Sequence, residues 1–66
     1  MTVTINGEEK ELPDGTTLLG CIRFFNWDPD VVVAELNGQI IGKEDFEGTR
    51  INPGDCLELL HFVGGG

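Results

Sequence analysis

The sequence has 66 residues, which is enough for one small domain and leaves no room for a second. Its 12 acidic and 4 basic side chains give a formal net charge of −8 at pH 7, which disfavours nucleic acids and anionic membranes as partners. The charge fits either attraction to a basic protein surface or simple solubility of a small domain, and it favours a monomer when free. A chain this short cannot easily enclose a catalytic cavity, so a carrier, an inhibitor or a binding module is favoured over an enzyme.

The first two predicted elements form a hairpin. Apolar and polar residues alternate over residues 2–5, and Asn6-Gly7 predicts a two-residue turn in which both residues have a positive φ. Residues 8–12 return as a polar second strand. Such a turn pairs Ile5 with Glu8 on one face, so either a bulge shifts the register or the second strand is a solvated edge. The sequence leaves that choice open.

A short helix is predicted next, with Thr16 or Thr17 as its N-cap. Gly20 inside it costs up to about 1 kcal/mol relative to alanine, which indicates close packing or a short, marginal helix. We expect the helix to end near Asn26, because Pro29 disfavours helical backbone before it. Its apolar face comprises Leu18, Leu19, Cys21, Ile22 and Phe25.

The second half of the chain reads as three further strands. Residues 31–36 are apolar on both faces, as in a strand inside a sheet, and Asn37-Gly38 turns the chain into a short strand at residues 39–41. Residues 42–50 form an irregular connection that Phe46 anchors to the core. Residues 56–63 are too apolar for an edge, so we expect them in the middle of the sheet, parallel to the first strand.

This order of elements predicts an α+β fold of the β-grasp, or ubiquitin-like, type. One main helix packs on one face of a four- to five-stranded mixed sheet. The predicted domain covers residues 1–63, and residues 64–66 form a flexible C-terminal glycine tail.

The three glycines after the predicted central strand are the sharpest functional feature. Because glycine has no Cβ, such a tail can thread a narrow channel in another protein. The carboxylate of Gly66 could then attack the α-phosphorus of ATP once an enzyme holds both groups in line, and the acyl-adenylate could accept sulfur or an amine. A glycine tail alone is more often a frayed terminus, but its place after a β-grasp strand reverses that preference.

The whole chain resembles the ThiS-type sulfur carrier proteins of thiamin biosynthesis. The resemblance rests on Ile5-Asn6-Gly7, on the run from Val33 to Ile41, and on the ending His61-Phe62-Val63-Gly64-Gly65-Gly66. It implies adenylation of the terminal glycine by an E1-like, ThiF-type enzyme that consumes ATP, and conversion to a thiocarboxylate with sulfur from a desulfurase. A ThiG-type thiazole synthase would then take up that sulfur.

Carried over to this sequence, the resemblance implies that Gly66 is the modified residue and that Gly64 and Gly65 lead it into the partners' active sites. The chain would be a protein substrate rather than an enzyme, with no catalytic residue and no bound cofactor of its own. Three alternatives stay open: the small subunit of molybdopterin synthase, a protein modifier conjugated through Gly66, and a plain interaction domain with an idle tail.

A docking surface is predicted on the face that the helix leaves uncovered. In the last strand, Leu57 and Leu59 point to one face, and Leu60 and Phe62 point to the other. We expect Leu60 and Phe62 to lie on the uncovered face and to form part of an apolar patch that docks the adenylating enzyme or thiazole synthase. An ordinary apolar surface is nearly as good an explanation.

The remaining candidates for chemistry are weaker. Cys21 and Cys56 do not make a disulfide framework, and we expect two reduced, half-buried thiols. With His61 they lack the paired ligand spacing of structural zinc, so no metal is assigned. His61 could relay protons, but a solvated strand histidine is favoured. The acidic run Glu44-Asp45, with Glu47, belongs to a polar loop and is expected to be solvated.

The sequence also bears on localisation. The N-terminal residues run directly into a strand pattern without a basic start and an apolar stretch. No apolar segment approaches the roughly 20 residues that cross a bilayer. We therefore expect a cytoplasmic protein.

Overall fold

The structure is a computed structural model and describes residues 1–61. Within that range the chain forms a mixed sheet, one α-helix and one short 3-10 helix. The strands are β1 (Thr2–Ile5), β2 (Glu8–Glu11), β3 (Val32–Leu36), β4 (Gln39–Ile41) and β5 (Cys56–His61). The α-helix is α1 (Leu18–Phe24), and the 3-10 helix is η1 (Lys43–Asp45).

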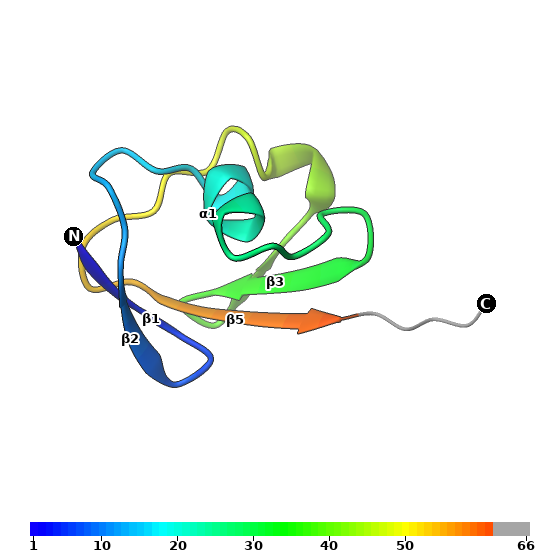
Figure 1. The fold of residues 1–66 in the computed structure, drawn as a ribbon. Coiled ribbons are helices and arrows are strands. Elements are labelled where there is room, and N and C mark those ends of the chain that lie inside the picture. The colour runs from blue at the N-terminus through cyan, green and yellow to red at the C-terminus, as the bar shows by residue number, and fades with distance from the viewer. Residues whose placement is uncertain (62–66) are drawn as a thin grey trace.

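The strands of residues 1–61 lie in the order β2-β1-β5-β3-β4. Strand β5 runs parallel to β1 and antiparallel to β3, and both hairpins are antiparallel. Figure 1 shows α1 lying over one face of this sheet. The predicted β-grasp arrangement is confirmed, including the central position of the last strand and its parallel pairing with the first.

The first hairpin settles the open question of the second strand. Asn6 has a φ of 52° and Gly7 a φ of 83°, as a two-residue turn with two positive φ values requires. Ile5 pairs with Glu8, so the register has no bulge there. Strand β2 is an edge strand, and Glu8 is exposed. The second strand is therefore a solvated edge.

Helix α1 begins and ends through specific hydrogen bonds. The Thr17 hydroxyl caps it by accepting from the backbone N–H of Gly20 at 3.1 Å. At the other end Asn26 has a φ of 62°, and the Trp27 N–H donates to the carbonyl of Ile22 at 2.9 Å. This left-handed ending stops the helix where the sequence predicted.

Gly20 is not held by tight packing. A Cβ built on it would come no closer than 3.4 Å to the Thr17 hydroxyl and 3.6 Å to a Thr16 methyl group. Helix α1 has only seven residues, so of the two explanations for Gly20 the short, marginal helix is the one supported.

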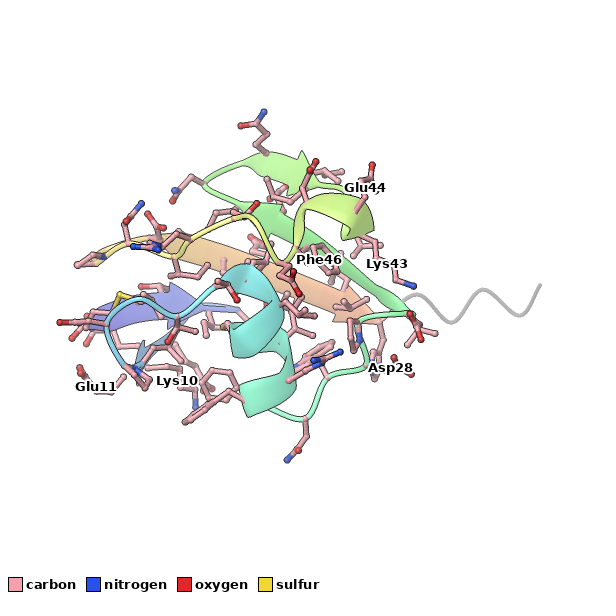
Figure 2. The ribbon with its side chains drawn as sticks, turned by 90° about the horizontal axis from the view of Figure 1, so that it is seen from above. Lys10, Glu11, Asp28, Lys43, Glu44 and Phe46 are labelled. Atoms are coloured by element: carbon pink, nitrogen blue, oxygen red, sulfur yellow. The ribbon has the colours of Figure 1, made fainter. Side chains whose placement is uncertain are left out.

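The core lies between α1 and the inner face of the sheet. Phe46, which follows η1, is 2 % exposed and anchors the irregular connection to that core, as predicted. Figure 2, a view from above, shows Phe46 beside α1. The buried core comprises Val3, Ile5, Leu12, Leu18, Cys21, Ile22, Val32, Ala34, Phe46, Ile51, Leu57 and Leu59.

Candidate functional site

The outer face of the sheet, opposite α1, carries an apolar patch. Leu60 on β5 is 64 % exposed and lies directly across from Val33 on β3, which is 37 % exposed. Ile40 on β4 is 67 % exposed and shares this face through its pairing with Glu35. We call Leu60, Val33 and Ile40 the outer patch. Leu60 is therefore exposed on the face where the strand alternation predicted it, and its docking role stays a prediction.

Two carboxylates lie on the same face, beside the outer patch. Glu35 on β3 and Glu58 on β5 are direct cross-strand partners, beside the pairing of Val33 with Leu60. Like charges directly opposite each other destabilise a sheet, by roughly 0.2–1 kcal/mol. A partner that brings apolar side chains to the outer patch and a lysine or arginine to this carboxylate pair would relieve that repulsion. The outer face therefore complements a basic protein surface.

On the β1 side, the end of β5 has no neighbouring strand among the described residues, and side chains hold it there. The Asn6 side chain accepts from the Leu59 backbone N–H at 2.8 Å and donates to the Leu59 carbonyl at 3.2 Å. The ring of Trp27 meets the ring of His61 edge-on, with centroids 4.6 Å apart. Both contacts fix the last described residues before the glycine tail.

A hollow of about 340 Å³ is lined in part by Asn6 and Trp27, the two residues whose side chains contact the end of β5. Apolar and aromatic groups from β1 and the end of α1 form one part of its wall, and Glu8 and Lys10 of edge strand β2 form the other. Lys10 pairs with Glu8 at 3.2 Å. The hollow is lined by Ile5, Asn6, Glu8, Lys10, Phe25 and Trp27.

The two cysteines differ from the predicted pair of half-buried thiols. Cys21, on the core-facing side of α1, is fully buried, whereas Cys56 is exposed at the start of β5. Burial raises the pKa of the Cys21 thiol to about 11, so this thiol stays protonated and unreactive at neutral pH. Cys56 shares the outer face with Leu60, because strand residues two apart point the same way, and it is therefore exposed rather than half-buried as predicted.

His61 and the acidic run are exposed to solvent, as predicted. His61 is exposed, although its ring touches Trp27, a contact that the sequence did not predict. Glu44, Asp45 and Glu47 are all exposed. Figure 2 shows Lys43 and Glu44 together on η1, away from Lys10 and Glu11 on β2. Lys43 pairs with Asp30, and its hydrogen bond and charge lower the pKa of that carboxyl.

Within residues 1–61, no three His, Cys, Asp or Glu side chains converge on a point where they could hold a metal ion. No helix of the described chain is long and apolar enough to cross a membrane. The predicted site residues Phe62, Gly64, Gly65 and Gly66 lie outside the described residues.

Sequence reasoning missed the roles of Asn6 and Trp27. The positive φ of the predicted turn is a sufficient explanation for Asn6, so the sequence predicted no contact for its side-chain amide. Trp27 follows the predicted end of the helix, and the sequence predicted no contact for its ring.

Comparison with known proteins adds independent support. The family model of the ThiS family matches residues 3–66. The sulfur carrier protein ThiS of Bacillus subtilis (strain 168) is 33% identical over 63 residues, which cover 94% of this chain and 96% of that protein. The crystal structure of a thiamine biosynthesis protein (ThiS) from Geobacter metallireducens is similar with a TM-score of 0.85 and 29% identity, over 100% of both chains.

A second kind of relative is longer. A thiazole synthase of Magnetococcus marinus is 30% identical over 66 residues. A thiazole synthase of Paramagnetospirillum magneticum is 33% identical over 66 residues. In both cases all of this chain is matched, but it spans only 20% of the relative's length.

Proposed function

The chain belongs to the ThiS family of sulfur carriers in thiamin biosynthesis, and we propose that it delivers sulfur for the thiazole ring through a thiocarboxylate on Gly66. The family match over residues 3–66, which includes the glycine ending, is the single observation that carries this proposal. In this role the chain is a substrate of other enzymes, and its own side chains supply no catalysis.

The proposed chemistry takes place on the terminal carboxylate. A carboxylate oxygen of Gly66 attacks the α-phosphorus of ATP in the active site of an E1-like adenylating enzyme, and pyrophosphate leaves. A persulfide sulfur, supplied through a desulfurase, then attacks the acyl carbon, and AMP leaves with the bridging oxygen. A thiol of the adenylating enzyme cleaves the resulting acyl disulfide, which releases the Gly66 thiocarboxylate and leaves a disulfide on the enzyme. The thiocarboxylate sulfur is finally given up to a thiazole synthase. Gly64 and Gly65, which lack a Cβ, lead Gly66 into each active site.

The outer patch is the proposed docking surface for both partners, together with Phe62. Leu60 is 64 % exposed beside Val33, and the Glu35–Glu58 pair adds negative charge at the centre of the same face. An aliphatic anchor with flanking charge is a common form of protein docking site. The net charge of −8 would steer the chain toward basic partner surfaces.

Thiazole synthase as a partner is supported by the longer relatives. In the enzymes of Magnetococcus marinus and Paramagnetospirillum magneticum, a segment similar to the whole of this chain belongs to a protein named thiazole synthase. A carrier segment joined to the synthase would have a high effective concentration at the active site that consumes its sulfur. A carrier that is a separate chain needs its docking surface to bring the tail to that active site.

Growth of a deletion strain tests the proposed pathway. Cells without this chain should require thiamin, and the thiazole precursor should restore their growth. The wild-type gene should also restore growth, whereas a gene that lacks the Gly66 codon should not. Normal growth without thiamin, or loss of molybdoenzyme activity instead, would contradict the thiazole assignment and favour the molybdopterin alternative.

A further inference from the structure

The Asn6 side chain takes the place of a missing strand residue. Strand β1 pairs with β5 at Thr4 and Ile5, and the Asn6 backbone N–H still donates to the Leu57 carbonyl at 2.9 Å. Gly7 then turns the chain away into β2. The two polar backbone groups of Leu59 on this side are satisfied by the Asn6 side chain alone, at 2.8 and 3.2 Å.

These two hydrogen bonds reach β5 at one residue and from one side only. On its other side, β5 pairs with β3 from Leu57 to His61. The β3–β5 ladder, which carries Leu60 and Val33 of the outer patch, therefore does not depend on Asn6. What depends on Asn6 is the β1 side of β5 around Leu59, two residues before the last described residue.

We infer that Asn6 is a positioning residue, whose side-chain amide fixes the direction in which the end of β5 presents the glycine tail to the adenylating enzyme. This inference rests on the proposed function. Without the Asn6 side chain, the outer patch would still dock, but the end of β5 would hold its productive direction for a smaller fraction of the time. Loss of Asn6 should therefore lower the rate within the complex more than the affinity.

The chain provides a matched control in its second hairpin. Asn37 has the same φ of 52° as Asn6, and both are followed by a glycine with a φ of 83°. The Asn37 side chain also bonds to β5, because it accepts from the Cys56 N–H at 2.9 Å, and it donates to the Asp55 carboxylate at 3.1 Å. Its contacts lie at the start of β5, far along the strand from the tail.

The experiment compares Asn6→Gly with Asn37→Gly. Glycine accepts a positive φ at either position, so both turns persist and each variant loses two side-chain hydrogen bonds. Amide hydrogen exchange of the free carrier should show lost protection at Leu59 in Asn6→Gly and at Cys56 in Asn37→Gly. This measurement tests the Asn6–Leu59 hydrogen bonds in the folded chain without any partner.

Steady-state kinetics with the adenylating enzyme of the same cell then test positioning. The assay follows ATP–pyrophosphate exchange, and the wild-type chain is the reference. For Asn6→Gly, kcat should fall about threefold to tenfold, the factor that corresponds to one hydrogen bond's net contribution, while KM for the carrier changes less than about twofold. For Asn37→Gly, both constants should stay within about twofold of wild type.

Each outcome decides a separate question. Equal kinetics for the two variants, with an active wild type, would overturn the positioning role and leave the proposed function intact. A rise in KM without a change in kcat would also overturn it, because Asn6 would then act on docking. A wild-type chain that supports no pyrophosphate exchange would overturn the proposed function, and the positioning role with it.

Discussion

The indole of Trp27 and the imidazole of His61 meet edge-on, with ring centroids 4.6 Å apart, and so join the segment after α1 to the last described residue of β5. An edge-on aromatic pair contributes about 0.5–1.5 kcal/mol beyond its buried area. The contact gives His61 a packing role at the base of the tail and requires no proton transfer from its ring.

Replacement of His61 separates packing from proton relay. The variant His61→Phe keeps a ring against Trp27 but cannot titrate, so we expect adenylation to stay within about twofold of wild type. The variant His61→Ala should lose the ring contact and lower stability by about 0.5–1.5 kcal/mol. Pyrophosphate exchange and urea unfolding measure the two effects. A folded His61→Phe chain without adenylation would instead assign His61 to proton transfer.

The outer patch should carry the docking energy. Leu60→Asp places a charge at its centre, so the affinity for the adenylating enzyme should fall by about tenfold or more, as expected when an apolar anchor is lost. Phe24→Asp is the matched control, because Phe24 is 58 % exposed but lies on α1. Titration calorimetry measures both affinities, and circular dichroism checks that both variants fold. Equal losses in the two variants would refute the assignment of the patch.

The two thiols should differ in reactivity with an aromatic disulfide reagent. Cys56 is exposed and should react within the mixing time, whereas Cys21 is buried and should react only as the domain unfolds. Cys56→Ser should remove the fast phase and leave the slow one. A single fast phase that accounts for both thiols would contradict the burial of Cys21.

The Cys21 thiol should also make stability fall in alkali. Burial raises its pKa from 9.0 to about 11 in the folded chain, so above pH 9 the unfolded state loses its proton first and gains stability. The free energy of unfolding should therefore fall between pH 9 and pH 11, by up to about 1.4 kcal/mol per pH unit. The sequence has no tyrosine to titrate in this window. Cys21→Ala should flatten this fall, and Cys56→Ser should retain it.

Two glycines should respond to alanine with opposite signs. Gly20 lies in α1 with room for a Cβ, so Gly20→Ala should stabilise the domain by up to about 1 kcal/mol. Gly38 has a φ of 83°, so Gly38→Ala should destabilise it by about 1–2 kcal/mol, although no atom lies within 4 Å of the added Cβ. Urea unfolding of both variants measures the two changes. A destabilising Gly20→Ala would mean that the helix packs more tightly there than its contacts indicate.

Local rules made most of the fold predictable. Each Asn-Gly pair specified a turn, and Pro29 and Asn26 marked the end of the helix, because these residue types constrain φ directly. The apolar character of residues 56–63 placed the last strand inside the sheet, since an edge strand of that composition would be exposed. These signals depend on a few residues each, and the structure confirms them.

Features that depend on tertiary geometry were not predictable. The choice between a bulged and a regular first hairpin depended on the position of β2 at the edge, where Glu8 can point to solvent without cost. Cys56 was expected to be half-buried, but it lies on the face of the sheet that α1 leaves uncovered and is exposed. The contacts from Asn6 to Leu59 and from Trp27 to His61 join residues far apart in sequence, so no local pattern could indicate them.

The central claim is tested most directly by the intact mass of the chain isolated from its own cells, with fragmentation to locate any change. The account predicts a species in which one oxygen is replaced by sulfur, with the change confined to Gly66, and its fraction should rise when thiazole synthase is absent. A chain that carries an ordinary carboxylate in every molecule, even in cells without thiazole synthase and starved of thiamin, would contradict the account.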